Sequence, residues 1–228
     1  NTITAFKNRA LDTSFAAAYF PPVKATLDEE SGTAGTAINA PASAAVLGAF
    51  GANDTIAHPW FAPAGFSRGA LGNETNDLAI QLNEDNVGSL YDARINPIVT
   101  NSTSNANESV LVFGQKTLQV KQNSLDRVNV RRLLIEIRRR VKRVANTIIF
   151  EPNRAQTLSN FNQLVQPILA QIKKDRGVKN FRVVIDSSTT TQADIENNTI
   201  RGKIFIQPTK SVEFISLDFE LNNSGAEI

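Results

Sequence analysis

The side chains that most often perform chemistry in proteins are scarce in this sequence. The chain has one histidine and no cysteine. A Ser-His-Asp arrangement would have to use His58, which stands beside Pro59 and Trp60 in a proline-interrupted stretch. A single histidine also cannot assemble a zinc site of the usual nitrogen and sulfur type. We therefore interpret His58 as a packed or surface side chain.

The carboxylates and glycines supply no better candidate. Asp186 ends an apolar run, where metal-dependent phosphotransfer enzymes often place a carboxylate, but no second carboxylate accompanies it at a useful spacing. A capping or turn role is favoured for Asp186. The Gly-Thr-Ala-Gly stretch at residues 32–35 is too short for a phosphate-binding fingerprint, and no Gly-Lys-Ser or Gly-Lys-Thr follows it. The sequence predicts no catalytic residue, no metal and no cofactor, and we expect a protein that is not an enzyme.

The strongest polar signal is a basic helix within residues 128–151. Asn129 is predicted to cap its start through a side-chain oxygen, and Pro152 prevents it from passing Glu151. Apolar residues recur at three- and four-residue steps and form one stripe: Val130, Leu133, Leu134, Ile137, Val141 and Val144. Cations occupy the other faces: Arg131, Arg132, Arg138, Arg139, Arg140, Lys142 and Arg143.

The positive charge of this helix is not apparent from the net charge of the whole chain. The net charge is +2, yet residues 127–154 hold nine lysines and arginines against Glu136 and Glu151. Such a patch indicates an acidic protein surface or a nucleic acid as partner. Aromatic side chains that would stack on bases are absent between Val128 and Ile149, which favours the acidic protein.

The remaining pattern predicts an α/β (α+β) fold in which helices pack on a mixed, mostly antiparallel sheet. Expected strands are residues 14–23, 78–82, 95–99, 110–120, 181–186, 200–207 and 212–221, and the further helices are 41–52, 84–93 and 158–177. Residues 1–12, 28–40, 58–71 and 101–108 are expected to be an arm or loops. Pro167 should kink or divide its helix, and Gly177 should end that helix in the left-handed conformation.

The amino-acid composition is that of a globular protein. Apolar residues make up 41% of the 228 residues and charged residues 20%, which is typical of globular domains. No apolar run reaches the roughly 20 residues that span a bilayer, so we expect no membrane insertion. The N-terminus has no signal-peptide pattern. The chain has no methionine and begins in mid-pattern, so we expect it to be part of a longer protein.

Several stretches, taken together, resemble the contractile tail sheath proteins of bacteriophages. The core signature is VNVRRLL at residues 128–134 followed by FEPN at 150–153. The other matching pieces, in the family's order, are PWFAPAGFSRG at 59–69, ARINPIV at 93–99, FGQKTL at 113–118 and IQPTKSVEFISLDFEL at 206–221. The resemblance extends from about residue 14 to residue 221.

The resemblance implies a structural subunit that polymerises around a tail tube and contracts to drive the tube through the host envelope. Its partners would be itself, in stacked hexameric rings, the tail tube protein, and the baseplate and tail terminator proteins, with no nucleic acid. The subunit would be assembled in the host cytoplasm and located in the virion. Residues 14–228 would form the tube-proximal core domain, and residues 1–13 an arm or linker from an upstream domain.

Two sets of site residues follow from combining the resemblance with the pattern. The tube-facing basic helix would use Arg131, Arg132, Arg138, Arg139, Lys142 and Arg143. An intersubunit strand would use Val212, Phe214, Ile215, Leu217 and Phe219. The same signatures occur in contractile bacteriocins and secretion-type injection machines, which remain alternatives, as does a basic nucleic-acid-binding module.

Overall fold

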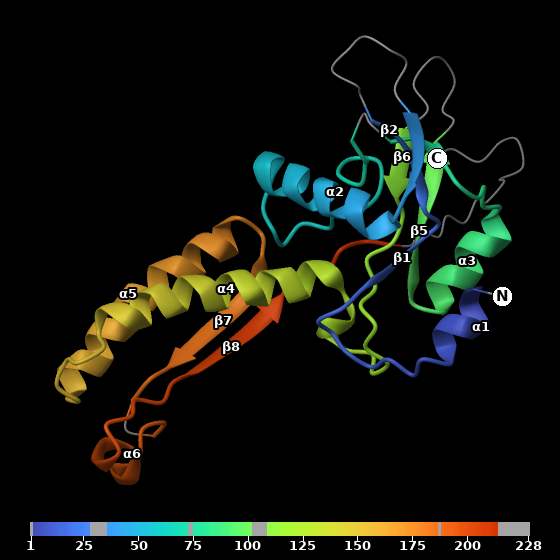
Figure 1. The fold of residues 1–228 in the computed structure, drawn as a ribbon. Helices are drawn as coiled ribbons and strands as arrows, with labels where there is room; N and C mark the ends of the chain where they lie inside the picture. Colours follow the sequence, from blue (N-terminus) through green and yellow to red (C-terminus); the bar gives the residue numbers. More distant parts are fainter. Residues whose placement is uncertain (1, 28–35, 73–74, 102–108, 187, 214–228) are drawn as a thin grey trace, which may run out of the picture.

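The computed structural model describes residues 2–27, 36–72, 75–101, 109–186 and 188–213. The chain builds two lobes (Figure 1). We call residues 2–126 the N-terminal lobe and residues 127–213 the C-terminal lobe. The first helix of the C-terminal lobe begins beside the N-terminal lobe and extends away from it.

The N-terminal lobe contains two small sheets. Its elements are α1 (Thr2–Lys7), β1 (Ala18–Phe20), β2 (Val23–Leu27), β3 (Thr36–Ala40), α2 (Ala42–Ile56), β4 (Thr75–Leu78), α3 (Glu84–Asp92), β5 (Ile95–Asn101), β6 (Ser109–Val112) and the short 3-10 helix η1 (Ser124–Asp126). In one sheet β1 runs parallel to β5, which is antiparallel to β6. In the other, β2 lies between β3 and β4, and both pairings are antiparallel.

Helix α2 closes the main core of the N-terminal lobe. Its small residues let it approach the strands closely, so that Val46 and Ala49 are buried with Val23, Ile98 and Val112. A smaller cluster lies beneath α3. The sheets therefore depend on the helices for their apolar faces, as expected for the α+β class.

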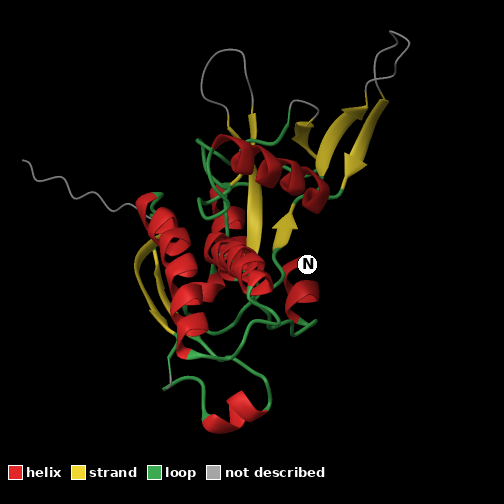
Figure 2. Ribbon diagram, turned by 90° about the vertical axis from the view of Figure 1, so that its left-hand side faces the viewer, coloured by secondary structure: helices red, strands yellow, loops and turns green. Residues whose placement is uncertain are grey.

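The C-terminal lobe is a helix pair on a two-stranded sheet. Its elements are α4 (Val128–Thr147), α5 (Ala155–Lys174), β7 (Val178–Val184), α6 (Gln192–Glu196) and β8 (Lys203–Pro208). Helices α4 and α5 cover one face of the antiparallel β7–β8 pair (Figures 1 and 2). The interface buries Leu133 and Ile137 of α4 against Phe161, Val165 and Leu169 of α5.

The predicted fold class is confirmed, with sheets that are mixed or antiparallel, but several elements differ from the expectation. The strand predicted at 14–23 is two strands, separated at Pro21 and Pro22. The loop predicted at 28–40 contains β3, and the arm predicted at 1–12 contains the short helix α1. The strand expected at 78–82 lies earlier, as β4. The loop expected at 101–108 falls almost entirely outside the described residues.

The division of α5 predicted at Pro167 and the left-handed stop predicted at Gly177 were wrong, whereas a kink at Pro167 stays a prediction. Pro167 does not divide the helix, which runs unbroken from Ala155 to Lys174. The proline lies on the exposed side, while Val165 and Leu169 are buried on either side of it, so packing holds both halves together. The left-handed residue after the helix is Arg176, with a φ of 61°, and not Gly177.

Helix α6 was not predicted, although its start carries a recognisable signal. The Thr191 hydroxyl accepts a hydrogen bond from the Asp194 amide at 3.3 Å, and an Asp194 carboxylate oxygen accepts one from the Thr191 amide at 3.0 Å. This reciprocal pair is a capping box. The carboxylate also accepts from Arg201 at 2.6 Å, which ties α6 to the start of β8.

We expect Thr191→Ala to loosen α6 without unfolding the lobe. Loss of an N-cap hydroxyl costs about 1 kcal/mol. Hydrogen exchange of the Ile195 and Asn197 amides, which bond to Thr191 and Ala193 carbonyls, should therefore accelerate about fivefold. Gln192→Ala is the control, because the side chain of Gln192 is exposed and makes a long 3.5 Å contact to Glu196. Equal exchange in the two variants would show that the cap contributes nothing.

Candidate functional site: the basic helix and its junctions

Most of the predicted apolar stripe of α4 is confirmed, but its predicted cap is not. Leu133 and Ile137 are buried in the core of the C-terminal lobe, and Val141 and Val144 pack at the edge of that core. Val130 is buried outside this cluster, and Leu134 is half-buried and not part of it. Arg127 occupies the N-cap position and makes no capping bond with its side chain. Asn129 is inside the helix. Its amide donates to the Trp60 carbonyl at 3.3 Å and to the Ser211 hydroxyl at 3.2 Å. Asn129 therefore joins the helix to two distant segments.

Two of the six predicted tube-facing residues bind the N-terminal lobe of the same subunit. The Arg131 guanidinium donates to the Ser14 carbonyl at 3.2 Å and to the Ser14 hydroxyl, and it lies 3.9 Å from the centre of the Phe15 ring. The Arg132 guanidinium donates to both carboxylate oxygens of Asp54 at 2.5 and 2.6 Å. These arginines hold the first turns of α4 against the N-terminal lobe, so we assign them a structural role.

The other four cations are exposed along one side of α4. Arg138, Arg139, Lys142 and Arg143 follow each other at the helical spacing that places them on adjoining turns. Ile135, of which 52% is exposed, precedes them on the same side. Among the described residues, Arg138, Lys142 and Arg143 have no ion pair. We call these three residues with Arg139 the basic face of α4.

Glu136 is the acid that balances part of this charge. It is 6% exposed, and it accepts hydrogen bonds from Arg139 at 2.9 Å and Arg140 at 2.7 Å. Burial alone would raise the Glu136 pKa, but the hydrogen bonds and charges of Arg139 and Arg140 outweigh burial and lower it below 4.5. Arg140 is thereby fixed near Trp60, with its guanidinium 5.6 Å from the ring.

This lowered pKa predicts how stability depends on pH. Because the folded-state pKa lies below the unfolded one, the charged Glu136 stabilises the fold above pH 4.5, and this contribution is lost as pH falls through the folded-state pKa. We expect Glu136→Gln to lower the urea midpoint at pH 7, and we expect the difference from the unsubstituted chain to become smaller at a second, acidic pH below 4.5, where Glu136 is increasingly protonated. A deficit of equal size at both pH values would contradict this assignment.

The sequence did not indicate how the loop at residues 58–61 is used. Trp60 is 4% exposed and lies in the hydrophobic cluster of the C-terminal lobe, although it belongs to the N-terminal lobe. Its indole nitrogen donates to the Asp175 carbonyl at 2.9 Å. A Cβ at Gly177 would lie 3.1 Å from the Trp60 ring and 2.7 Å from Ile172. Gly177 is therefore required for close approach and not for its backbone conformation.

The other residues considered from the sequence for catalysis or metal binding lie at the surface or outside the described residues. His58 stacks on Trp60 at 4.5 Å, and its Nε2 lies 3.9 Å from an Asp175 carboxylate oxygen. Asp186 accepts hydrogen bonds from the Ser188 amide at 2.8 Å and its hydroxyl at 2.5 Å, which is the turn role expected for it. Within the described residues, no group of three histidines or acids could hold a metal, and no helix could cross a membrane.

Of the predicted intersubunit strand, the structure describes only the start. Val212 is 81% exposed and lies outside any strand. Phe214, Ile215, Leu217 and Phe219 fall outside the described residues, so the pairing of this segment stays a prediction.

Known proteins share both the sequence and the fold. Residues 120–222 match the phage tail sheath C-terminal domain. The chain is 32% identical over 187 residues to the tail sheath protein of Vibrio phage KVP40, covering 82% of this chain and 27% of that protein. It is 30% identical over 187 residues to the tail sheath protein of Enterobacteria phage T4, covering 82% of this chain and 28% of that protein.

The chain belongs to the tail sheath family.

Among solved structures, the PVC sheath complex of an extracellular contractile injection system in its contracted state is similar. It aligns with a TM-score of 0.80 at 26% identity, over 97% of this chain and 61% of that one. The match to the tail sheath C-terminal domain includes all of the described C-terminal lobe, and with it the basic face of α4. Membership confirms the resemblance drawn from the sequence motifs. The chain spans only 27–28% of the curated sheath proteins cited above.

Proposed function

We propose that this chain is part of a contractile tail sheath subunit, and that the basic face of α4 contacts the tail tube. The observation that carries the proposal is the exposed set Arg138, Lys142 and Arg143, which have no ion pair among the described residues of a sheath-family domain. Exposed cations on one side of a helix are complementary to an anionic surface, and a tube with an acidic wall would supply one.

The strength of such contacts suits a sheath that must bind the tube before contraction and slide along it during contraction. An exposed ion pair contributes about 0 to 1 kcal/mol, so one subunit binds the tube weakly and many bind it firmly. Contraction then breaks contacts that are individually weak. A buried apolar interface of the same area would resist sliding more strongly, because its apolar surface would have to be exposed to water.

The other expectations about assembly belong to the same proposal. The subunit would form stacked hexameric rings, meet baseplate and tail terminator proteins at the ends, and become part of the virion after assembly in the host cytoplasm. Its work would be mechanical, without catalytic residues, metal or cofactor. Residues 1–13 would act as an arm or linker, and residues 212–221 would pair with the sheet edge of a neighbouring subunit.

Electron microscopy of the full-length parent protein, expressed alone and with its tube protein, tests this function. Tubular or ringed polymers in which α4 faces the tube are the expected result. A monodisperse monomer in both preparations would overturn the proposal. In that case a DNA-binding assay across a salt series would be decisive for the nucleic-acid alternative, because phosphate contacts release counterions and weaken steeply with salt.

The structural likeness to an injection-system sheath favours a second candidate of the same mechanical class. A bacteriocin or secretion-type machine would use the same sheath without a genome to deliver. Micrographs of the native particle distinguish the two, since a phage carries a DNA-filled capsid above the sheath. The identities of 30–32% to phage sheath proteins, against 26% to the injection-system sheath, favour the phage.

A further inference from the structure

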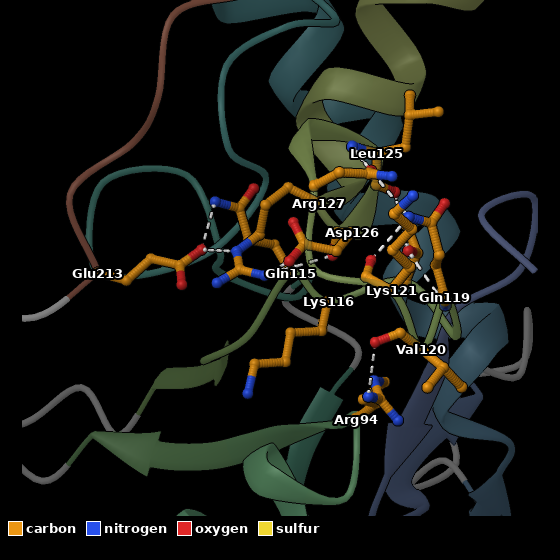
Figure 3. Close-up of polar contacts among 12 residues, drawn as sticks. Arg94, Gln115, Lys116, Gln119, Val120, Lys121, Leu125, Asp126, Arg127 and Glu213 are labelled. Atoms are coloured by element: carbon orange, nitrogen blue, oxygen red, sulfur yellow. Dashed lines mark hydrogen bonds and ion pairs between the residues drawn. The ribbon is translucent and has the colours of Figure 1, made fainter. Parts of the chain in front are cut away.

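Side chains from three separate segments, none of them part of the basic face, meet at one carboxylate. Glu213 accepts hydrogen bonds from the Tyr91 hydroxyl at 2.5 Å, the Gln115 amide at 3.0 Å and the Arg127 guanidinium at 2.6 Å. Figure 3 shows Gln115, Arg127 and Glu213 pointing toward one another. Tyr91 belongs to α3, Gln115 to the FGQKTL motif, and Arg127 is the N-cap of α4. We call this group the Glu213 clamp.

The partners of Glu213 are themselves fixed. The Val128 amide donates to the Gln115 carbonyl at 2.7 Å, which joins the first turn of α4 to the FGQKTL motif. Lys116 donates to the Tyr91 carbonyl at 2.8 Å, and its ammonium lies 3.7 Å from the centre of the Tyr91 ring. Asn96, which is fully buried, accepts from the Lys116 amide at 2.6 Å. Tyr91 and Gln115 are therefore also held by contacts that do not involve Glu213.

The segment that carries Glu213 has few other attachments. The backbone bonds of β8 end with the Thr209 amide, which donates to the Gly177 carbonyl at 3.2 Å. Beyond it, within the described part of the chain, residues 210–213 are attached by hydrogen bonds of the Ser211 and Glu213 side chains. Hollows of about 280 and 810 Å³ flank Val212 and Glu213. Side chains, and not a strand ladder, hold this segment.

Charge strengthens the attachment. Burial would raise the Glu213 pKa, but hydrogen bonds from Arg127 and Tyr91 and the charge of Arg127 lower it below its ordinary value. A partly buried carboxylate with charged and neutral donors makes hydrogen bonds about twice as strong as neutral ones. Glu213 is thus ionised at neutral pH, and its charge strengthens the hydrogen bonds that hold it between Tyr91, Gln115 and Arg127.

We propose that Glu213 is a positioning residue that clamps the end of the domain to α3 and α4, so that the following residues leave the subunit from a fixed point. This inference rests on the proposed function, in which residues 212–221 pair with a neighbouring subunit. Tension on that segment reaches Arg127 at the first turn of α4 directly, so the clamp couples the intersubunit strand to the helix with the basic face.

Spin labels can test the clamp in the monomer, because the chain has no cysteine to interfere. Labels attached to Val212→Cys and Asn146→Cys report the position of the segment relative to the far end of α4. Val212 and Asn146 are both exposed, and α4 between Val130 and Asn146 is roughly 24 Å long, which suits pulsed electron spin resonance. We expect Glu213→Ala to widen the distance distribution at least twofold.

Matched variants make the result specific. Glu196→Ala, which removes an exposed acid from α6, should leave the distribution unchanged. Glu213→Gln keeps the size of the side chain, and the Tyr91 hydroxyl can accept a hydrogen bond from the new amide in place of the one that it donates to the carboxylate. The substitution removes the ion pair with Arg127. We therefore expect a distance distribution of intermediate width. If Glu213→Ala does not fold, Glu213→Gln carries the test. A distribution as narrow as that of the parent in either folded Glu213 variant overturns the clamp.

A second measurement separates the clamp from the sheath function. In the full-length parent protein, Glu213→Ala should lower the yield of polymers seen by electron microscopy by at least tenfold, whereas Glu196→Ala should not. Full polymerisation of Glu213→Ala would show that the clamp does not position the strand. Failure of the unsubstituted protein to polymerise would overturn the proposed function, while the spin-label result would still decide the clamp.

Discussion

The triple variant Arg138→Glu, Lys142→Glu, Arg143→Glu should lose tube association while remaining folded. Each of these side chains is exposed and has no ion pair among the described residues, so its replacement costs the fold little. Against an acidic tube wall, the change turns three attractions into three repulsions. At about 1 kcal/mol for each attraction lost, binding of one subunit weakens on the order of 100-fold, and the polymer multiplies the loss. Cosedimentation of sheath protein with purified tubes measures it.

Arg139 is left unchanged in this variant for a structural reason. It pairs with Glu136, so its reversal would disturb the helix itself and confuse folding with binding. The control is Lys174→Glu, Lys179→Glu, Lys203→Glu, which reverses three exposed lysines away from α4. Each substitution changes the charge by two units, so both variants move from +2 to −4. Equal cosedimentation of the two would mean that net charge, and not the basic face, determines binding.

The sequence could predict the parts of this site whose residues lie close together along the chain, but not the parts whose residues lie far apart along it. The stripe of α4 is a local pattern, so periodicity found it, and with it the fold class. The partners of Arg131 and Arg132 are Ser14 and Asp54, which lie 117 and 78 residues away in the chain. Spacing along a helix cannot show which of its cations meet acids or carbonyls of another lobe, so these two were grouped with the exposed ones.

The errors in secondary structure have similarly physical causes. Asn129 has the residue type of a cap, but its amide is used by Trp60 and Ser211, far along the chain, and so it lies inside the helix. Pro167 breaks helices when its neighbours are free, whereas here buried residues on both sides hold the helix together. In contrast, the Thr191 and Asp194 pair was readable as a capping signal, and the helix after it could have been predicted.

Trp60→Ala should produce the largest loss of folding stability among single substitutions considered for this chain. The ring is 4% exposed, packs against Gly177 and Ile172, and donates its one hydrogen bond to the Asp175 carbonyl. Truncation would leave a cavity that the backbone on both sides cannot close, and it would leave that carbonyl without its donor. A loss of about 3–5 kcal/mol in the free energy of unfolding is expected, as for other buried tryptophans.

The position of Trp60 between the two lobes determines which lobe should lose stability first in the Trp60→Ala variant. Its loop belongs to the N-terminal lobe and its ring to the core of the C-terminal lobe, so the variant should weaken the C-terminal lobe first. Urea unfolding followed by hydrogen exchange should show α5 and β7 exchanging before β5. Phe66→Ala is the control, because Phe66 is 68% exposed and should cost less than about 1 kcal/mol. If Trp60→Ala cost no more than this control, the ring would not be important for joining the two lobes, and their connection would depend on the other contacts between them, such as those of Arg131 and Arg132 and of the Glu213 clamp.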